Sequence, residues 1–132
     1  NLGLNYTYTS TYDGAEQDDP NKNSSYYNAQ MVRVPRNIIN IKTNFKLPNY
    51  EDVDFTLSTK WSDMARDYGN GNRTYNDERT KSYFVNDLNL NYNFYKLNFY
   101  LNITNVFDEN YETARDYSQL GRSFNFGLKN LY

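Results

Sequence analysis

Apolar and polar side chains alternate along most of this chain, which is the pattern of extended strands with two different faces. The alternation is clearest in residues 97–103, where Leu97, Phe99, Leu101 and Ile103 are separated by polar or amphipathic side chains. It recurs in five further segments: 1–12, 37–47, 52–62, 83–94 and 121–132. The sequence therefore predicts six strands, each with one apolar and one polar face.

The connections between the predicted strands alternate between long and short. Long polar stretches follow the first, third and fifth strands and hold twelve of the sixteen acidic residues, whereas short turns lie at 48–51 and 94–96. Strands of about eleven residues exceed the globular mean of about five to six, and they match the roughly ten tilted residues that cross a bilayer. The apolar stripes carry no charge, and the strand lysines all lie on the polar face: Lys42, Lys46, Lys60, Lys96 and Lys129.

Aromatic residues gather at both ends of the apolar stripes. Those near the long connections are Tyr8, Tyr12, Trp61 and Phe84. Those near the short turns are Phe45, Tyr92, Phe94 and Tyr132. Two such groups are typical of the girdles at the two membrane–water interfaces. The pattern as a whole predicts an all-β fold with six antiparallel transmembrane strands, in which the apolar face meets lipid and the polar face lines a lumen.

Composition narrows the possible functions. The 132 residues include no cysteine and no histidine, and the net charge is −2. Disulfide scaffolds, thiolate metal sites and histidine-based catalysis are thereby excluded, and no basic surface for nucleic acid is present. The mean hydropathy of −0.98 would suggest disorder, but aromatic residues make up 18% of the chain, and disordered chains contain few of them. We expect neither an enzyme nor a bound cofactor or metal.

The residues after the fifth strand carry a family resemblance. They begin with Asn105-Val106-Phe107-Asp108 and Tyr111, continue through a polar loop to Gly121-Arg122, and end in a strand that contains Phe124 and stops on Tyr132. This arrangement resembles the C-terminus of TonB-dependent outer-membrane receptors. The motif residues on which we base the resemblance, each with an expected structural role, are Asn105, Phe107, Asp108, Tyr111, Gly121, Arg122, Phe124 and Tyr132.

The resemblance implies a function and a set of partners. Residues 1–132 would be the C-terminal part of a larger barrel in the bacterial outer membrane, because six strands are fewer than the eight of the smallest such barrels. The missing parts would include a plug domain that contacts the TonB complex. Receptors of this family import scarce small-molecule ligands such as ferric siderophores, cobalamin or glycans. Other partners would be outer-membrane lipid and the barrel assembly machinery, which is expected to bind the C-terminal strand.

Two other interpretations share the strand pattern. A soluble, glycan-binding β-sandwich also alternates, with its apolar stripes packed into a core. A passive barrel, either a porin or the translocator of an autotransporter, would share the stripes, the girdles and the aromatic terminus. Asp13, Asp18 and Asp19 lack the spacing of a calcium-binding loop and are predicted to be solvated.

Overall fold

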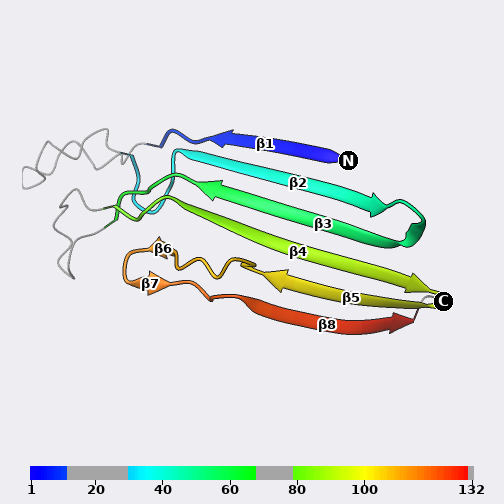
Figure 1. Cartoon of the computed structure of the whole chain (residues 1–132). Helices are drawn as coiled ribbons and strands as arrows, with labels where there is room; N and C mark the ends of the chain where they lie inside the picture. The colour runs from blue at the N-terminus through cyan, green and yellow to red at the C-terminus, as the bar shows by residue number, and fades with distance from the viewer. Residues whose placement is uncertain (12–29, 68–78, 131–132) are drawn as a thin grey trace, which may run out of the picture.

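The computed structural model describes residues 1–11, 30–67 and 79–130. Six strands form one antiparallel sheet in the order β1-β2-β3-β4-β5-β8, and two short strands form a separate hairpin. The strands of the sheet are β1 (Leu2–Tyr8), β2 (Asn37–Leu47), β3 (Tyr50–Ser62), β4 (Tyr83–Phe94), β5 (Leu97–Thr104) and β8 (Ser123–Asn130). Figure 1 shows a single twisted layer, with β1 and β8 at its two edges. The predicted all-β fold and antiparallel order are confirmed, and within this stretch the barrel is not closed.

The strand register places like residues in rows across the middle of the sheet. One apolar row consists of Phe45, Phe55, Leu90, Leu101 and Phe126. The adjacent polar row, on the opposite face, consists of Asn44, Thr56, Asn89, Asn102 and Asn125. A shift of one residue would exchange the two faces, so the alternating pattern excludes every register that differs from this one by an odd number of residues.

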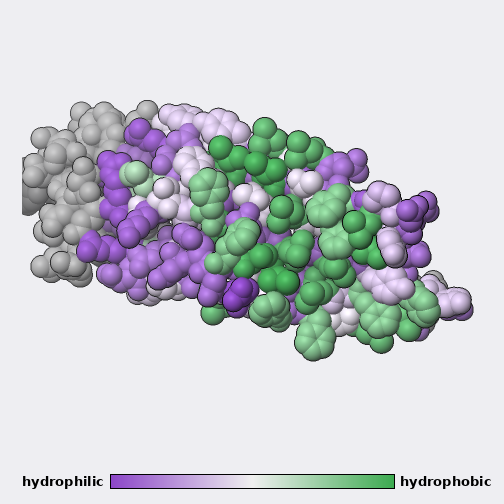
Figure 2. Space-filling model, in the orientation of Figure 1, coloured by the Kyte–Doolittle hydropathy of each residue, from purple (hydrophilic) through white to green (hydrophobic). Residues whose placement is uncertain are grey.

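The apolar face of the sheet is exposed. Leu2 is 75% exposed and Phe126 81%, while the only buried hydrophobic residues among those described are Ala65 and Tyr83. Figure 2 shows the apolar side chains as a band across the middle of the sheet, with polar residues towards the long connections. A soluble sandwich would cover this band with a second sheet, and none packs there in the described part of the chain. The exposed band is therefore suited to lipid.

The aromatic residues form two groups at the ends of the band. Near the long connections, the ring centroids of Trp61 and Phe84 are 6.4 Å apart. Near the short turns, Tyr92 lies 6.2 Å from Phe99. Tyr92 lies eight positions after Phe84 along β4, which corresponds to about 26 Å of extended strand. At the tilt of about 35–45° in barrel strands this length spans about 20 Å across the bilayer, which fits within an apolar band of about 25 Å. Two residues that we assigned to these groups, Tyr12 and Tyr132, lie outside the described residues.

The structure corrects several local predictions. The turn predicted at 48–51 has only two residues, Pro48 and Asn49 (φ 69°), and the pairing shifts next to it, between Lys46 and Leu47. Proline cannot adopt the positive φ that regular two-residue hairpins need at this position, and the irregular pairing accompanies that constraint. Asn86 interrupts the apolar stripe without a bulge, because it pairs in register with Thr59 and the two side chains form a hydrogen bond of 2.7 Å.

The first and last strands are shorter than predicted. β1 ends at Tyr8 and β8 spans Ser123–Asn130. The polar connection after β5, predicted as a loop, contains a hairpin of β6 (Glu112–Ala114) and β7 (Tyr117–Ser118). Its two-residue turn includes Asp116 with φ 62°, a conformation that aspartate tolerates better than most residues. Asp13, Asp18 and Asp19 lie outside the described residues.

Candidate functional site at the long-connection end

Buried polar side chains gather at the end of the sheet from which the long connections leave. The buried polar or charged residues of the described part are Gln30, Ser62, Asp67, Thr80 and Asn105. All of them lie in or next to the long connections. Burying a polar group costs free energy unless the group is hydrogen-bonded, so each of these residues is expected to make specific hydrogen bonds.

Asn105 closes the base of the connection between β5 and β8. The Asn105 residue is only 3% exposed. Its Oδ1 accepts a hydrogen bond of 2.9 Å from the Glu109 amide, and its Nδ2 donates to the carbonyl oxygens of Glu109 (2.8 Å) and Leu120 (3.4 Å). The backbone has φ 50°, a left-handed conformation that asparagine adopts more readily than other residues with a side chain. One amide thus joins the two ends of the connection.

Asp108 and Gly121 form a second link at the same base. The Asp108 Oδ1 accepts a hydrogen bond of 2.7 Å from the Arg122 amide. A Cβ atom on residue 121 would lie only 2.6 Å from that oxygen, so only glycine leaves room for the carboxylate. The Arg122 guanidinium lies 5.9 Å from the Phe124 ring centroid, and its Nη1 donates to the Val106 carbonyl at 3.5 Å. Residues separated by thirteen positions therefore meet.

The other motif residues lie apart from this link. Phe107 is exposed, and Phe124 is exposed on the apolar face of β8, while Tyr132 lies outside the described residues. Tyr111 packs on Tyr83, with ring centroids 4.5 Å apart. Burial raises the pKa of the Tyr111 phenol, with smaller contributions from Tyr83 and Asp87. The phenol is therefore neutral at physiological pH and serves as an apolar and hydrogen-bonding surface.

The β6–β7 hairpin lies on the polar face of the sheet. Tyr83, which Tyr111 covers, is on that face, as is its partner Ser62. Glu112 and Thr113 share the lining of a cavity of about 200 Å³ with Lys60 and Ser62. A larger cavity of about 510 Å³ lies between the hairpin and the start of β4; its lining includes Arg79, Lys81, Tyr83, Glu109, Tyr111 and Arg115. The hairpin therefore covers the polar face near its long-connection end.

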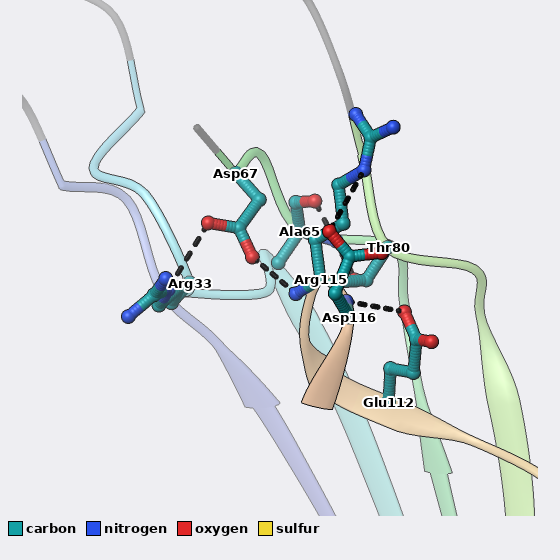
Figure 3. Close-up of polar contacts among 7 residues, drawn as sticks. All are labelled: Arg33, Ala65, Asp67, Thr80, Glu112, Arg115 and Asp116. Atoms are coloured by element: carbon teal, nitrogen blue, oxygen red, sulfur yellow. Dashed lines mark hydrogen bonds and ion pairs between the residues drawn. The ribbon is translucent and has the colours of Figure 1, made fainter. Parts of the chain in front are cut away.

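A buried carboxylate brings three connections together (Figure 3). Asp67, which follows β3, is 2% exposed. Its Oδ1 lies 3.0 Å from the Nε of Arg33, which precedes β2. Its Oδ2 accepts a hydrogen bond of 2.5 Å from the backbone amide of Arg115 in the hairpin turn. Asp67 was not among the predicted site residues, because nothing in the sequence distinguishes it from the other acidic residues of the long connections until these segments are folded together.

The polar face of the strands carries a network of side-chain amides. Thr56 donates to Asn44 at 2.8 Å, and Asn98 donates to Asn93 at 2.8 Å. Asn89 also donates to Asn102. Charge enters this face as well, with Lys46 and Asp54 forming an ion pair of 3.3 Å. Amides that already bond to one another retain donors and acceptors for a further partner, so the face suits reversible polar contacts with water or protein.

A search with protein-family models identifies the strands. Residues 1–106 match the family described as TonB dependent receptor-like, beta-barrel. The chain belongs to this family. This family consists of transport receptors rather than enzymes, and its members lie in the outer membrane of Gram-negative bacteria, as this barrel segment does. Of the eight motif residues, only Asn105 lies in the matched range, and the family role of all eight remains a prediction.

Solved structures share this receptor-barrel fold. The ferric-catecholate import receptor Fiu from E. coli K12 in its closed form superposes with a TM-score of 0.65 at 17% identity, over 80% of this chain and 15% of that chain. FpvAI in its complex with pyocin S2 superposes with a TM-score of 0.64 at 19% identity, over 76% of this chain and 15% of that chain. The siderophore receptor PiuA from Acinetobacter baumannii superposes with a TM-score of 0.57 at 22% identity, over 78% of this chain and 13% of that chain. A comparison with curated protein sequences gives no match. The present chain thus spans about one seventh of these receptors.

Proposed function

We propose that this chain forms the C-terminal strands of an outer-membrane receptor that imports a small ligand with energy from the TonB complex. The observation that carries the proposal is the family match over residues 1–106, the same residues that form five strands of a sheet with an exposed apolar face. Ferric siderophores are the ligand class that we favour, since two of the three similar structures are named for ferric-catecholate or siderophore import. Cobalamin and glycans are the other classes.

In this proposal each part of the chain has a distinct task. The apolar band anchors the strands in outer-membrane lipid, and the amide-rich face lines the lumen, where a plug domain encoded elsewhere in the parent protein would pack against it. The plug would contact TonB and rearrange to open a path for the ligand. The C-terminal strand, with exposed Phe124, Phe126 and Leu128, would bind the barrel assembly machinery and then pair with the first strand to close the barrel.

Uptake by cells tests this function. We expect that deleting the parent gene abolishes growth on a ferric catecholate siderophore as sole iron source, and that a strain without functional TonB behaves in the same way. Iron-replete growth is the control and should not change. Uptake that persists without TonB would overturn the proposal in favour of a passive barrel. TonB-dependent uptake of cobalamin or a glycan, without any of the siderophore, would overturn the ligand class alone.

Orientation is a separate prediction. Outer-membrane barrels have short periplasmic turns and longer extracellular loops, so the β4–β5 turn should face the periplasm and the β5–β8 connection the cell exterior. Tyr95 in the turn is 91% exposed and Leu120 in the connection 86%. In the parent protein on intact cells, cysteine at Leu120 should react with a membrane-impermeant thiol reagent, and cysteine at Tyr95 should react only after lysis. Labelling of Tyr95→Cys on intact cells, with Leu120→Cys unreactive, would reverse the topology.

A further inference from the structure

The β5–β8 connection is held at its base, where it leaves and rejoins the strands, and at its tip, the turn of the β6–β7 hairpin. At its base, the Asn105 side chain joins the backbones of Glu109 and Leu120, and the Asp108 carboxylate accepts the Arg122 amide. At its tip, the Arg115 amide donates to Asp67. A segment fixed at one end only would be free to swing into solvent. Because both the base and the tip are fixed, the connection follows a defined path, and we call residues 109–120 the strap.

The path of the strap crosses the polar face of the sheet. Its base belongs to β5 and β8, whereas Asp67 lies in the connection that leaves β3, so the strap passes β4 on its way to the tip. Tyr111 packs on Tyr83 along this path, and Thr113 lies over the same cavity as Lys60. Ser62, on the polar face, is consequently buried, while Phe84 on the apolar face at the same level is exposed. The strap therefore covers the lumen wall and leaves the lipid surface open.

Asp67 is the attachment point at the tip. Its carboxylate is almost completely buried yet carries a charge partner on one oxygen, Arg33, and a backbone donor on the other, Arg115. Hydrogen bonds to an ionised, buried group are stronger than those between neutral groups. The attachment also joins the strap to the segment before β2 through Arg33. Within the strap, Glu112 accepts the Asp116 amide at 3.2 Å and stiffens the turn.

We propose that Asp67 holds the β6–β7 hairpin as a strap across the long-connection mouth of the lumen. The strap narrows the passage along the β3–β4 wall and forms one side of the open cavity of about 510 Å³ between the hairpin and β4. Loss of the hydrogen bond from the Arg115 amide to Asp67 loosens the tip while the base stays closed, since Asn105 and Asp108 do not depend on that contact. Asp67 is a positioning residue in this device. Only the assignment of the mouth to the cell exterior rests on the proposed function.

Hydrogen exchange measures the strap directly. In the full-length parent protein in detergent micelles, Asp67→Asn should accelerate exchange in residues 112–118 at least tenfold. The Glu109 amide, which bonds to Asn105, and the amides of β4 should keep their rates. Asp116→Asn is the matched control, because Asp116 is an exposed aspartate of the same turn: the change removes its 3.8 Å ion pair with the Arg115 side chain but leaves the hydrogen bond from the Arg115 backbone amide to Asp67 in place. Unchanged hairpin exchange in Asp67→Asn would overturn the proposal.

A second variant cuts the same contact from the other side. Arg115→Pro removes the backbone N–H that Asp67 accepts, and it lies in an exposed hairpin turn outside the main sheet. It should accelerate hairpin exchange as Asp67→Asn does, and it should also speed labelling of a cysteine at Lys60 by a thiol reagent. If Asp67→Asn does not fold, Arg115→Pro decides by itself. Unchanged exchange and labelling would exclude the strap, whereas loss of siderophore uptake with normal exchange would bear only on the proposed function.

Discussion

Lysine in place of Leu101 is expected to destabilise the parent barrel by about 1–3 kcal/mol, because a basic side chain on the lipid face costs about 2–4 kcal/mol at the bilayer midplane and about 0–1 kcal/mol near the interfaces, and Leu101 lies between the two. Leu101 lies in the apolar row between Leu90 and Phe126. This row is inside the band bounded by the Phe84 and Tyr92 levels of β4. The loss is measured by urea titration of the protein folded into lipid vesicles.

Asn102→Lys is the matched control, one residue further along the same strand. Asn102 lies on the opposite face, in the row with Asn89 and Asn125, so the lysine reaches the aqueous lumen. It loses the hydrogen bond from Asn89, which costs about 1 kcal/mol. A larger loss for Asn102→Lys than for Leu101→Lys would show that the lipid and lumen faces are assigned the wrong way round.

Alanine at position 105 is expected to lower the free energy of unfolding of the parent barrel by about 3 kcal/mol, since buried polar partners left unsatisfied cost roughly 1–3 kcal/mol each. Asn105→Ala removes an amide that bonds to both backbone groups of Glu109 and to the Leu120 carbonyl. Alanine also tolerates the left-handed φ of 50° less well than asparagine does. The change is measured by the same vesicle titration.

Asn110→Ala is the control for this second prediction, because Asn110 is an exposed asparagine of the same connection. Its replacement should change stability by less than about 0.5 kcal/mol. Hydrogen exchange should show in addition that Asn105→Ala increases exchange at Glu109 and leaves the centre of β5 protected. Equal stability of the Asn105→Ala and Asn110→Ala proteins would refute a structural role for the Asn105 side chain.

The two predictions concern different kinds of interaction. The stability change in Leu101→Lys comes from the preference of the whole apolar row for lipid over water, so its size depends on which face of the sheet the residue occupies. Asn105 acts through three specific hydrogen bonds at one backbone conformation, so its effect depends on atomic geometry. The motif spacing 105–108 and 121–122 is explained by that geometry, because Asp108 reaches the Arg122 amide only where residue 121 has no side chain.

The alternating pattern was enough to predict the sheet. A strand has a period of two, so parity along the chain assigned each side chain to a face. Parity excludes registers shifted by one residue, and the structure gives the pairing itself. The turn at Phe94–Leu97 was predicted within one residue for the same reason. Strand ends were less accurate, as in β1, because pairing there depends on the neighbouring strand rather than on residue type.

The candidate site depended on contacts that no local pattern encodes. Asp67, Arg33 and Arg115 belong to three different connections, and their meeting requires the hairpin to fold back over β4. Tyr83 and Tyr111 lie 28 positions apart and stack only in that arrangement. Periodicity therefore determined which residues face lipid and which face the lumen, because solvent selects a face at every position. Tertiary structure decided where the polar connection lies, because a few buried hydrogen bonds between distant segments set its path.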